Sequence, residues 1–115
     1  MSDFRSNITK HFKTKVNGEL NKISVPEWEM DIYYKNAYSF ATEAKIIELQ
    51  QNGKVVEALV ESVIAKSLNP DGKTIFSSAD RQMLLREADP DVILRIAGEM
   101  NKATAEYKYE DLEKN

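Results

Sequence analysis

The sequence predicts an α+β domain that is mostly α-helical, with four to five helices around a central helix at 54–68 and a small antiparallel β-hairpin near 19–35. Three observations support this fold class. Apolar residues recur at helical spacing in 54–68, they alternate with polar residues near 20–35, and strong helix start and stop signals punctuate the rest. The 115 residues suit one domain. We expect an N-terminal arm at 1–17, a globular domain at 18–105 and a polar C-terminal tail at 106–115.

The central helix is the segment against which the other elements are expected to pack. Its apolar side chains, at spacings of three and four, are Val55, Val56, Leu59, Val60, Val63, Ile64 and Leu68. Its polar edge consists of Glu57, Glu61, Ser62, Lys66 and Ser67. An apolar stripe wider than a third of the circumference predicts a core helix that is covered on more than one side.

The hairpin is predicted from an alternation that Pro26 interrupts, which gives strands of roughly 19–25 and 28–35. Trp28, Met30, Ile32 and Tyr34 share the face that is expected to cover the helices. Two strands are marginally stable alone, so they need this support.

Local signals place the remaining helices. Ser39 is expected to cap a helix at about 40–52, which Gly53 ends. Asn69-Pro70-Asp71-Gly72 predicts a turn, and Ser77 with Asp80 resembles a capping box before a helix at about 78–88, whose inward residues are Met83, Leu84 and Ala88. Asp89-Pro90-Asp91 predicts the start of a last helix, which runs to about Ala105.

The N-terminal arm has Phe4, Ile8 and Phe12 at intervals of four, which favours a short amphipathic helix with basic residues on its other side. These side chains either dock on the domain or bind a partner.

Composition and motifs argue against several functions. The net charge of −3 disfavours nucleic acid, and no apolar segment approaches the 18 residues of a membrane span. The start, MSDFRSNITK, lacks the apolar segment of a signal peptide, so a cytoplasmic location is expected. The chain has no Cys and one histidine, His11, without a partner of metal-ligand spacing. We therefore expect no catalytic, metal or cofactor site, and no enzyme activity.

With these functions excluded, the sequence predicts a protein that acts by binding another protein. Trp28, Tyr33, Tyr34 and Tyr38 lie within eleven residues, and such side chains are frequent in binding hot spots. We expect Trp28 and Tyr34 to point inward, and Tyr33 and Tyr38 to point outward. The candidate partner-binding residues are Phe4, Ile8, Phe12, Trp28, Met30, Tyr33, Tyr38 and Met83. Met30, Met83 and Met100 are either adaptable contacts or ordinary core.

Several short motifs, in their order and spacing, resemble a phage tail assembly chaperone over about residues 10–102. They are Val25-Pro26-Glu27-Trp28, Asp31-Ile32-Tyr33, the segment 53–59, Asp71-Gly72-Lys73 with Phe76, and Asp89-Pro90-Asp91-Val92-Ile93 with Ala97 and Met100-Asn101. The resemblance implies a non-enzymatic protein that binds the phage tape measure protein, keeps it soluble and assists tail tube assembly.

The same resemblance implies a location in the host cell cytoplasm and absence from the mature virion of a long-tailed phage or prophage. The major tail tube protein is a further candidate partner, and self-association is left open. The alternative is a small bacterial adaptor or regulatory module that binds another protein through the hairpin aromatics.

Overall fold

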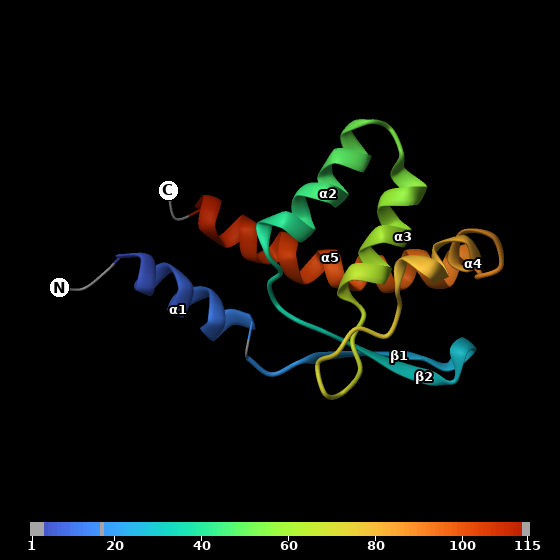
Figure 1. Cartoon of the computed structure of the whole chain (residues 1–115), viewed down its shortest axis with the longest axis horizontal. Coiled ribbons are helices and arrows are strands. Elements are labelled where there is room, and N and C mark those ends of the chain that lie inside the picture. Colours follow the sequence, from blue (N-terminus) through green and yellow to red (C-terminus); the bar gives the residue numbers. More distant parts are fainter. Residues whose placement is uncertain (1–3, 17, 114–115) are drawn as a thin grey trace.

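The computed structural model describes the backbone of residues 4–16 and 18–113, and the side-chain surroundings of residues 4–13 and 18–102. Helices and strands follow in the order α1 (Phe4–Val16), β1 (Asn21–Val25), the 3-10 turn η1 (Pro26–Trp28), β2 (Met30–Tyr34), α2 (Phe40–Gln51), α3 (Val55–Lys66), the 3-10 turn η2 (Ser78–Asp80), α4 (Arg81–Arg86) and α5 (Pro90–Glu113). This confirms the predicted class, a mostly helical α+β fold with a two-stranded antiparallel hairpin (Figure 1). None of the described helices is both long and apolar enough to cross a membrane.

The β-hairpin pairs β1 with β2 in the register Ile23 opposite Ile32, and η1 closes its end. Pro26 begins that turn, where its missing N–H costs no ladder bond, as predicted. Leu68, just after α3, exchanges backbone hydrogen bonds of 2.9 and 2.8 Å with Tyr33, and so ties the helices to the edge of β2.

The helices α2 and α3 form a hairpin of their own. Ser39 caps α2 by accepting a hydrogen bond from the Thr42 N–H at 3.3 Å. Gly53 has φ +77°, the left-handed conformation that glycine adopts without strain, and the chain reverses there into α3. Both local predictions are confirmed.

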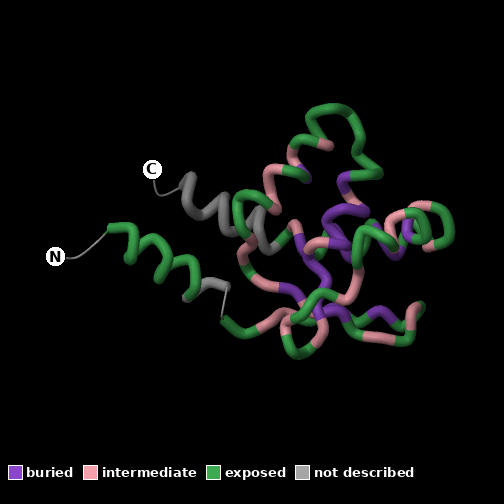
Figure 2. The backbone as a smooth tube through the Cα atoms, in the orientation of Figure 1, coloured by how far each residue is buried: buried purple, intermediate pink, exposed green. Residues whose placement is uncertain are grey.

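The core lies where α3, α5 and one face of the hairpin meet (Figure 2). Fully or almost fully buried residues from each of these elements are Ile32, Val25, Val63, Ile96, Ala97 and Met100. The prediction that α3 is the central helix is therefore confirmed for its middle and C-terminal parts. Met100 is core, so it is not one of the exposed methionines.

The first turn of α3 corrects the sequence prediction. Val55 and Val56 were assigned to the core, but they are 55% and 65% exposed. The buried part of the helix begins only at Ala58, because the turn with Gly53 holds the first residues away from the sheet and α5 (Figure 1).

The polar edge of α3 is exposed at Glu57, but from Glu61 to Ser67 its polar residues are buried rather than solvated. Lys66 is 1% exposed, and its Nζ lies 2.7 Å from Oε1 of Glu43 on α2 and 5.3 Å from the centre of the Tyr38 ring. The Tyr38 hydroxyl accepts a hydrogen bond from the Lys35 N–H and donates one to the Lys66 carbonyl, both at 2.8 Å. The expectation that Tyr38 points outward was therefore wrong, since its hydroxyl joins the hairpin exit to α3.

Burial raises the pKa of Tyr38 to about 12, with smaller contributions from Glu43 and Tyr34 of the same sign. The neutral hydroxyl can donate to the Lys66 carbonyl, whereas a phenolate could not.

The last two helices start where the sequence predicts but differ in extent. Ser77 and Asp80 form the capping box, although the helix predicted at 78–88 is a 3-10 turn followed by only six α-helical residues. Asp89 Oδ1 accepts from the Asp91 N–H at 2.9 Å, and α5 begins at Pro90. The backbone of α5 continues to Glu113 instead of ending near Ala105, because 106–113 contain no glycine or proline to stop it. The side chains of the predicted polar tail lie outside the described residues.

Helix α1 is present where the spacing of Phe4, Ile8 and Phe12 favours a helix, and it stands apart from the other elements (Figure 1). Its apolar stripe is not covered by the domain: Phe4 and Ile8 are 66% and 64% exposed, and Phe12 is 38% exposed. The alternative that these side chains dock on their own domain is therefore not seen.

Candidate functional site

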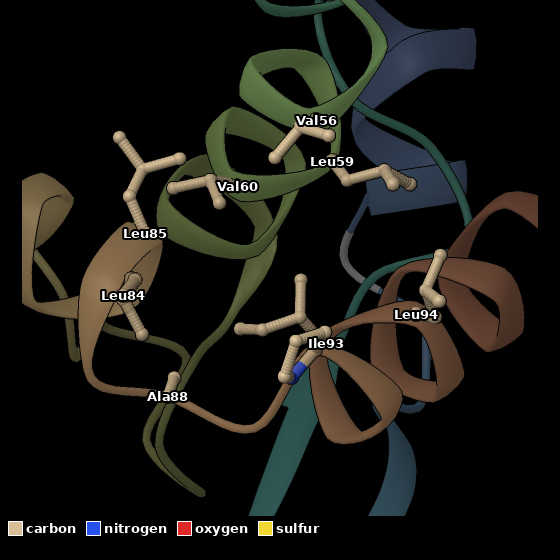
Figure 3. Close-up of a pocket in the computed structure, with 9 residues that line it drawn as sticks. Val56, Leu59, Val60, Leu84, Leu85, Ala88, Ile93 and Leu94 are labelled. Carbon is tan, nitrogen blue, oxygen red and sulfur yellow. The ribbon is translucent and has the colours of Figure 1, made fainter.

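The candidate site is an apolar surface on both sides of α4. On one side, α3, α4 and the start of α5 enclose a hollow of about 140 Å³, which we call the aliphatic groove. Its lining consists of Val56, Leu59, Val60, Leu84, Leu85, Ala88, Pro90, Ile93 and Leu94. Figure 3 shows Val56, Leu59 and Val60 of α3 on one wall, Leu84 and Leu85 on another, and Ile93 of α5 pointing into the space between them.

On the other side of α4, residues of the hairpin, of the segment before η2 and of α4 and its C-terminal end line a second hollow of about 280 Å³, which we call the methionine hollow. Its lining consists of Trp28, Met30, Phe76, Met83, Leu84, Glu87 and Ala88. Trp28 packs its ring edge-on against Phe76, with the ring centres 6.2 Å apart and the planes at 81°. Leu84 and Ala88 line both hollows, so α4 is a ridge between them.

An ion-pair network fixes α4 against α3. The Glu61 carboxylate, 10% exposed, accepts from Arg81 at 2.7 Å through Oε2 and lies 3.3 Å from Lys45 through Oε1. Burial raises the pKa of Glu61, but the hydrogen bonds from Arg81 and Lys45 outweigh this effect, so the pKa lies below its ordinary value. The six-residue helix α4 thus has a charged anchor in addition to its buried Leu84.

A second ion pair fixes the hairpin turn against α5. Arg95 donates two hydrogen bonds to Glu27, at 2.7 and 2.8 Å. These bonds from Arg95 lower the pKa of Glu27 to about 2. Because Glu27 precedes Trp28 in the turn, this pair helps to set the wall of the methionine hollow.

The chemistry of this surface is that of apolar contact. Glu87 is the charged side chain in the two linings, and the remaining positions are aliphatic, aromatic, methionine or proline. Within the described residues, no group of three or more His, Cys, Asp or Glu side chains could hold a metal ion. Exposed apolar surface of this kind is a candidate for protein or ligand contact.

The structure brings three of the predicted partner-binding residues together. Trp28, Met30 and Met83 line the methionine hollow. Met83 was also expected to point inward from its helix, but it is 39% exposed, because α4 presents Leu84 to the core instead. Whether these residues bind a partner stays a prediction.

The other predicted residues do not join this surface. Phe4, Ile8 and Phe12 lie on α1, whereas Tyr33 is half-buried at the edge of β2 and Tyr38 bridges to α3. Tyr34 is buried, as expected, and desolvation raises its pKa.

Sequence reasoning missed the aliphatic groove. Val56 and Leu94 were not chosen, although they are 65% and 51% exposed at its rim. The available signal was the width of the apolar stripe of α3, which exceeds what α5 and the hairpin can cover. From the sequence alone, such a wide stripe predicts burial and not an open groove.

The fold and this surface define a class of protein: a small, mostly helical α+β protein with an open apolar face. Its described residues contain no cluster of metal-ligating side chains. Among solved structures, the fold is similar to that of the bacteriophage HK97 tail assembly chaperone. The TM-score is 0.55 and the sequence identity 18%, over 84% of this chain and 94% of that one. The resemblance seen in the sequence motifs is thus confirmed at the level of the fold. No family model and no curated protein matches the chain.

Proposed function

We propose that this protein is a tail assembly chaperone that binds a phage tape measure protein, keeps it soluble and assists tail tube assembly, without enzyme activity. The observation that carries the proposal is the open apolar surface around α4, on a fold similar to that of a tail assembly chaperone. Such a protein acts in the host cell cytoplasm and is absent from the mature virion. The major tail tube protein is the second candidate partner.

The methionine hollow is the part of this surface that best suits a long apolar client. A client with many different apolar helices demands contacts that can repack from one helix to the next. Met30 and Met83 have flexible, polarizable side chains that allow this, and Trp28 adds rigid apolar area. The hollow is an open depression, so a helix can lie along it without entering a closed cavity.

Co-expression tests the proposal. The tape measure protein from the same genome is produced alone, with the wild-type chain, with Met83→Asp and with Gln82→Asp as the matched control. Gln82 is exposed on α4 but lines neither hollow. We expect the wild type and Gln82→Asp to raise the soluble tape measure protein equally, and Met83→Asp to raise it several-fold less, because a carboxylate cannot be desolvated against an apolar helix.

Two outcomes would contradict different parts of the proposal. If the tape measure protein is no more soluble with the wild-type chain than alone, the chaperone function is wrong. If Met83→Asp performs as well as the wild type, the function stands and the methionine hollow is not its site.

A further inference from the structure

The accessible thioethers of the described residues gather in one place. Met83 is 39% exposed and Met30 is half-buried, and both line the methionine hollow. Met100, the third methionine among the described residues, is 2% exposed in the core. We propose that Met83, followed by Met30, is a site of reversible oxidation by peroxides, and that the sulfoxide at Met83 weakens the binding of apolar helices in the hollow.

The reaction is a two-electron oxidation of the sulfur. A lone pair of the Met83 sulfur attacks one oxygen of hydrogen peroxide, and the S–O bond forms as the O–O bond breaks. The other oxygen takes the remaining proton and leaves as water. The product is methionine sulfoxide, in which a flexible apolar side chain has become polar. Methionine sulfoxide reductases reverse the change with a thiol as the reductant.

Exposure sets the order in which the three sulfurs are oxidised. The peroxide has to reach the sulfur through water, so an exposed thioether reacts faster than one that the core encloses. Because α4 presents Leu84 to the core, Met83 is left on the solvent side of that helix. Met30 is the first residue of β2 and is less exposed. Met100 belongs to the core between α3, α5 and the hairpin, so the folded chain protects it.

Oxidation at Met83 changes the hollow and spares the fold. The side chain is exposed, so water hydrates the new oxygen in the free chain and no core contact is lost. An apolar helix that covers the hollow removes this water. Apart from the indole N–H of Trp28, the lining side chains carry no hydrogen-bond donor that could replace it. Burial of the oxygen then costs free energy, and the helix binds more weakly.

The effect on binding rests on the proposed function, whereas the order of oxidation does not. Peptide mapping by mass spectrometry tests that order. The full-length chain is treated with hydrogen peroxide for increasing times, either folded or unfolded in urea, and is then digested. In the folded chain we expect Met83 to be oxidised several-fold faster than Met30 and at least about tenfold faster than Met100. In urea the three rates should be similar. A folded chain in which Met100 reacts as fast as Met83 would overturn the proposal.

Trp28 reports on the hollow without a client, because it is the single tryptophan of the chain and lines the same hollow as Met83. We expect its fluorescence emission to change with the time course of Met83 oxidation, and to return when methionine sulfoxide reductase and dithiothreitol are added. Met83→Leu, which has no sulfur at this position, should lose this phase. Emission that stays constant after Met83 is fully oxidised would show that the sulfoxide does not alter the hollow, which would also overturn the proposal.

Binding is measured with a soluble helical segment of the tape measure protein from the same genome. The treatment is stopped when Met83 is oxidised and Met30 is largely intact. We expect the affinity of the wild type to fall by about tenfold and to recover after reduction. The affinity of Met83→Leu, compared with its own untreated sample, should change by less than about twofold, because position 83 then has no sulfur to oxidise.

The outcomes separate this inference from the proposed function. If the untreated wild type binds the segment and its affinity is the same after oxidation, the inference is wrong and the proposed function stands. If the untreated wild type does not bind at all, the proposed function is contradicted. The order of oxidation and the emission of Trp28 then still decide whether Met83 is the oxidation site of the hollow.

Discussion

The buried ion pair between Lys66 and Glu43 offers the sharpest test of how α3 is held. Lys66 is 1% exposed, whereas the side chain of Glu43 is 22% exposed. Glu43→Gln removes the negative charge and leaves the ammonium group buried. The group then faces a neutral amide at position 43 and the Tyr38 ring.

The expected loss of stability follows from the geometry. At 2.7 Å and an effective dielectric constant of 20, the attraction between the two charges is about 6 kcal/mol. Most of it offsets the cost of taking the ammonium group out of water, so breaking such a pair typically costs about 3–5 kcal/mol. The glutamine oxygen still accepts a hydrogen bond, and water reaches position 43, so we expect Glu43→Gln to lower the free energy of unfolding by about 2–3 kcal/mol.

Urea unfolding at neutral pH, followed by circular dichroism, measures this loss. Glu43→Gln combined with Lys66→Met should recover most of the stability, because the buried charge is then absent. Glu48→Gln, at an exposed position of the same helix, should change stability by less than about 0.5 kcal/mol. If Glu43→Gln lowers the free energy of unfolding no more than Glu48→Gln does, the ammonium group of Lys66 is not buried as described and the reasoning is refuted.

Three further predictions concern the hairpin and its contacts. Trp28→Ala should lower the free energy of unfolding by about 2 kcal/mol in a urea titration. This loss is smaller than the loss expected for a fully buried tryptophan, because Trp28 is half-buried. An unchanged midpoint would place its ring in solvent. Because Arg95 lowers the pKa of Glu27 from 4.5 to about 2, the stability that this carboxylate contributes is present above pH 4.5 and lost as pH falls toward 2. The midpoints of wild type and Glu27→Gln should therefore converge over that range, and a constant difference would contradict the ion pair. Tyr38→Phe should cost about 1 kcal/mol through the lost hydrogen bond to the Lys66 carbonyl. Because the pKa of Tyr38 is raised from 10 to about 12, stability should also fall between pH 10 and 12 in wild type and less in Tyr38→Phe.

Local signals allowed much of the fold to be predicted. The capping box at Ser77, the start of α5 at Asp89-Pro90 and the reversal at Gly53 each depend on residues within one turn of chain. The alternation around Pro26 likewise gave the hairpin, because a period of two requires no knowledge of what covers the strand.

What failed depends on residues far apart in sequence. The apolar stripe of α3 does not reveal that its first turn, with Val55 and Val56, extends past the elements that cover the rest. Burial of Lys66 and Glu61 required partners on α2 and α4, which periodicity cannot locate. The aliphatic groove was missed for the same reason, because it exists only once α3, α4 and α5 are brought together.

The central claim, that the apolar face beside α4 grips an apolar helix of another protein, is tested most directly by calorimetric titration at several temperatures. A soluble helical segment of the tape measure protein is titrated into the wild-type chain, into Met83→Asp and into Gln82→Asp. We predict binding with a negative heat-capacity change for wild type and Gln82→Asp, since apolar surface leaves water, and at least tenfold weaker binding for Met83→Asp. Equal affinities for all three chains, or binding without a heat-capacity change, would contradict the claim.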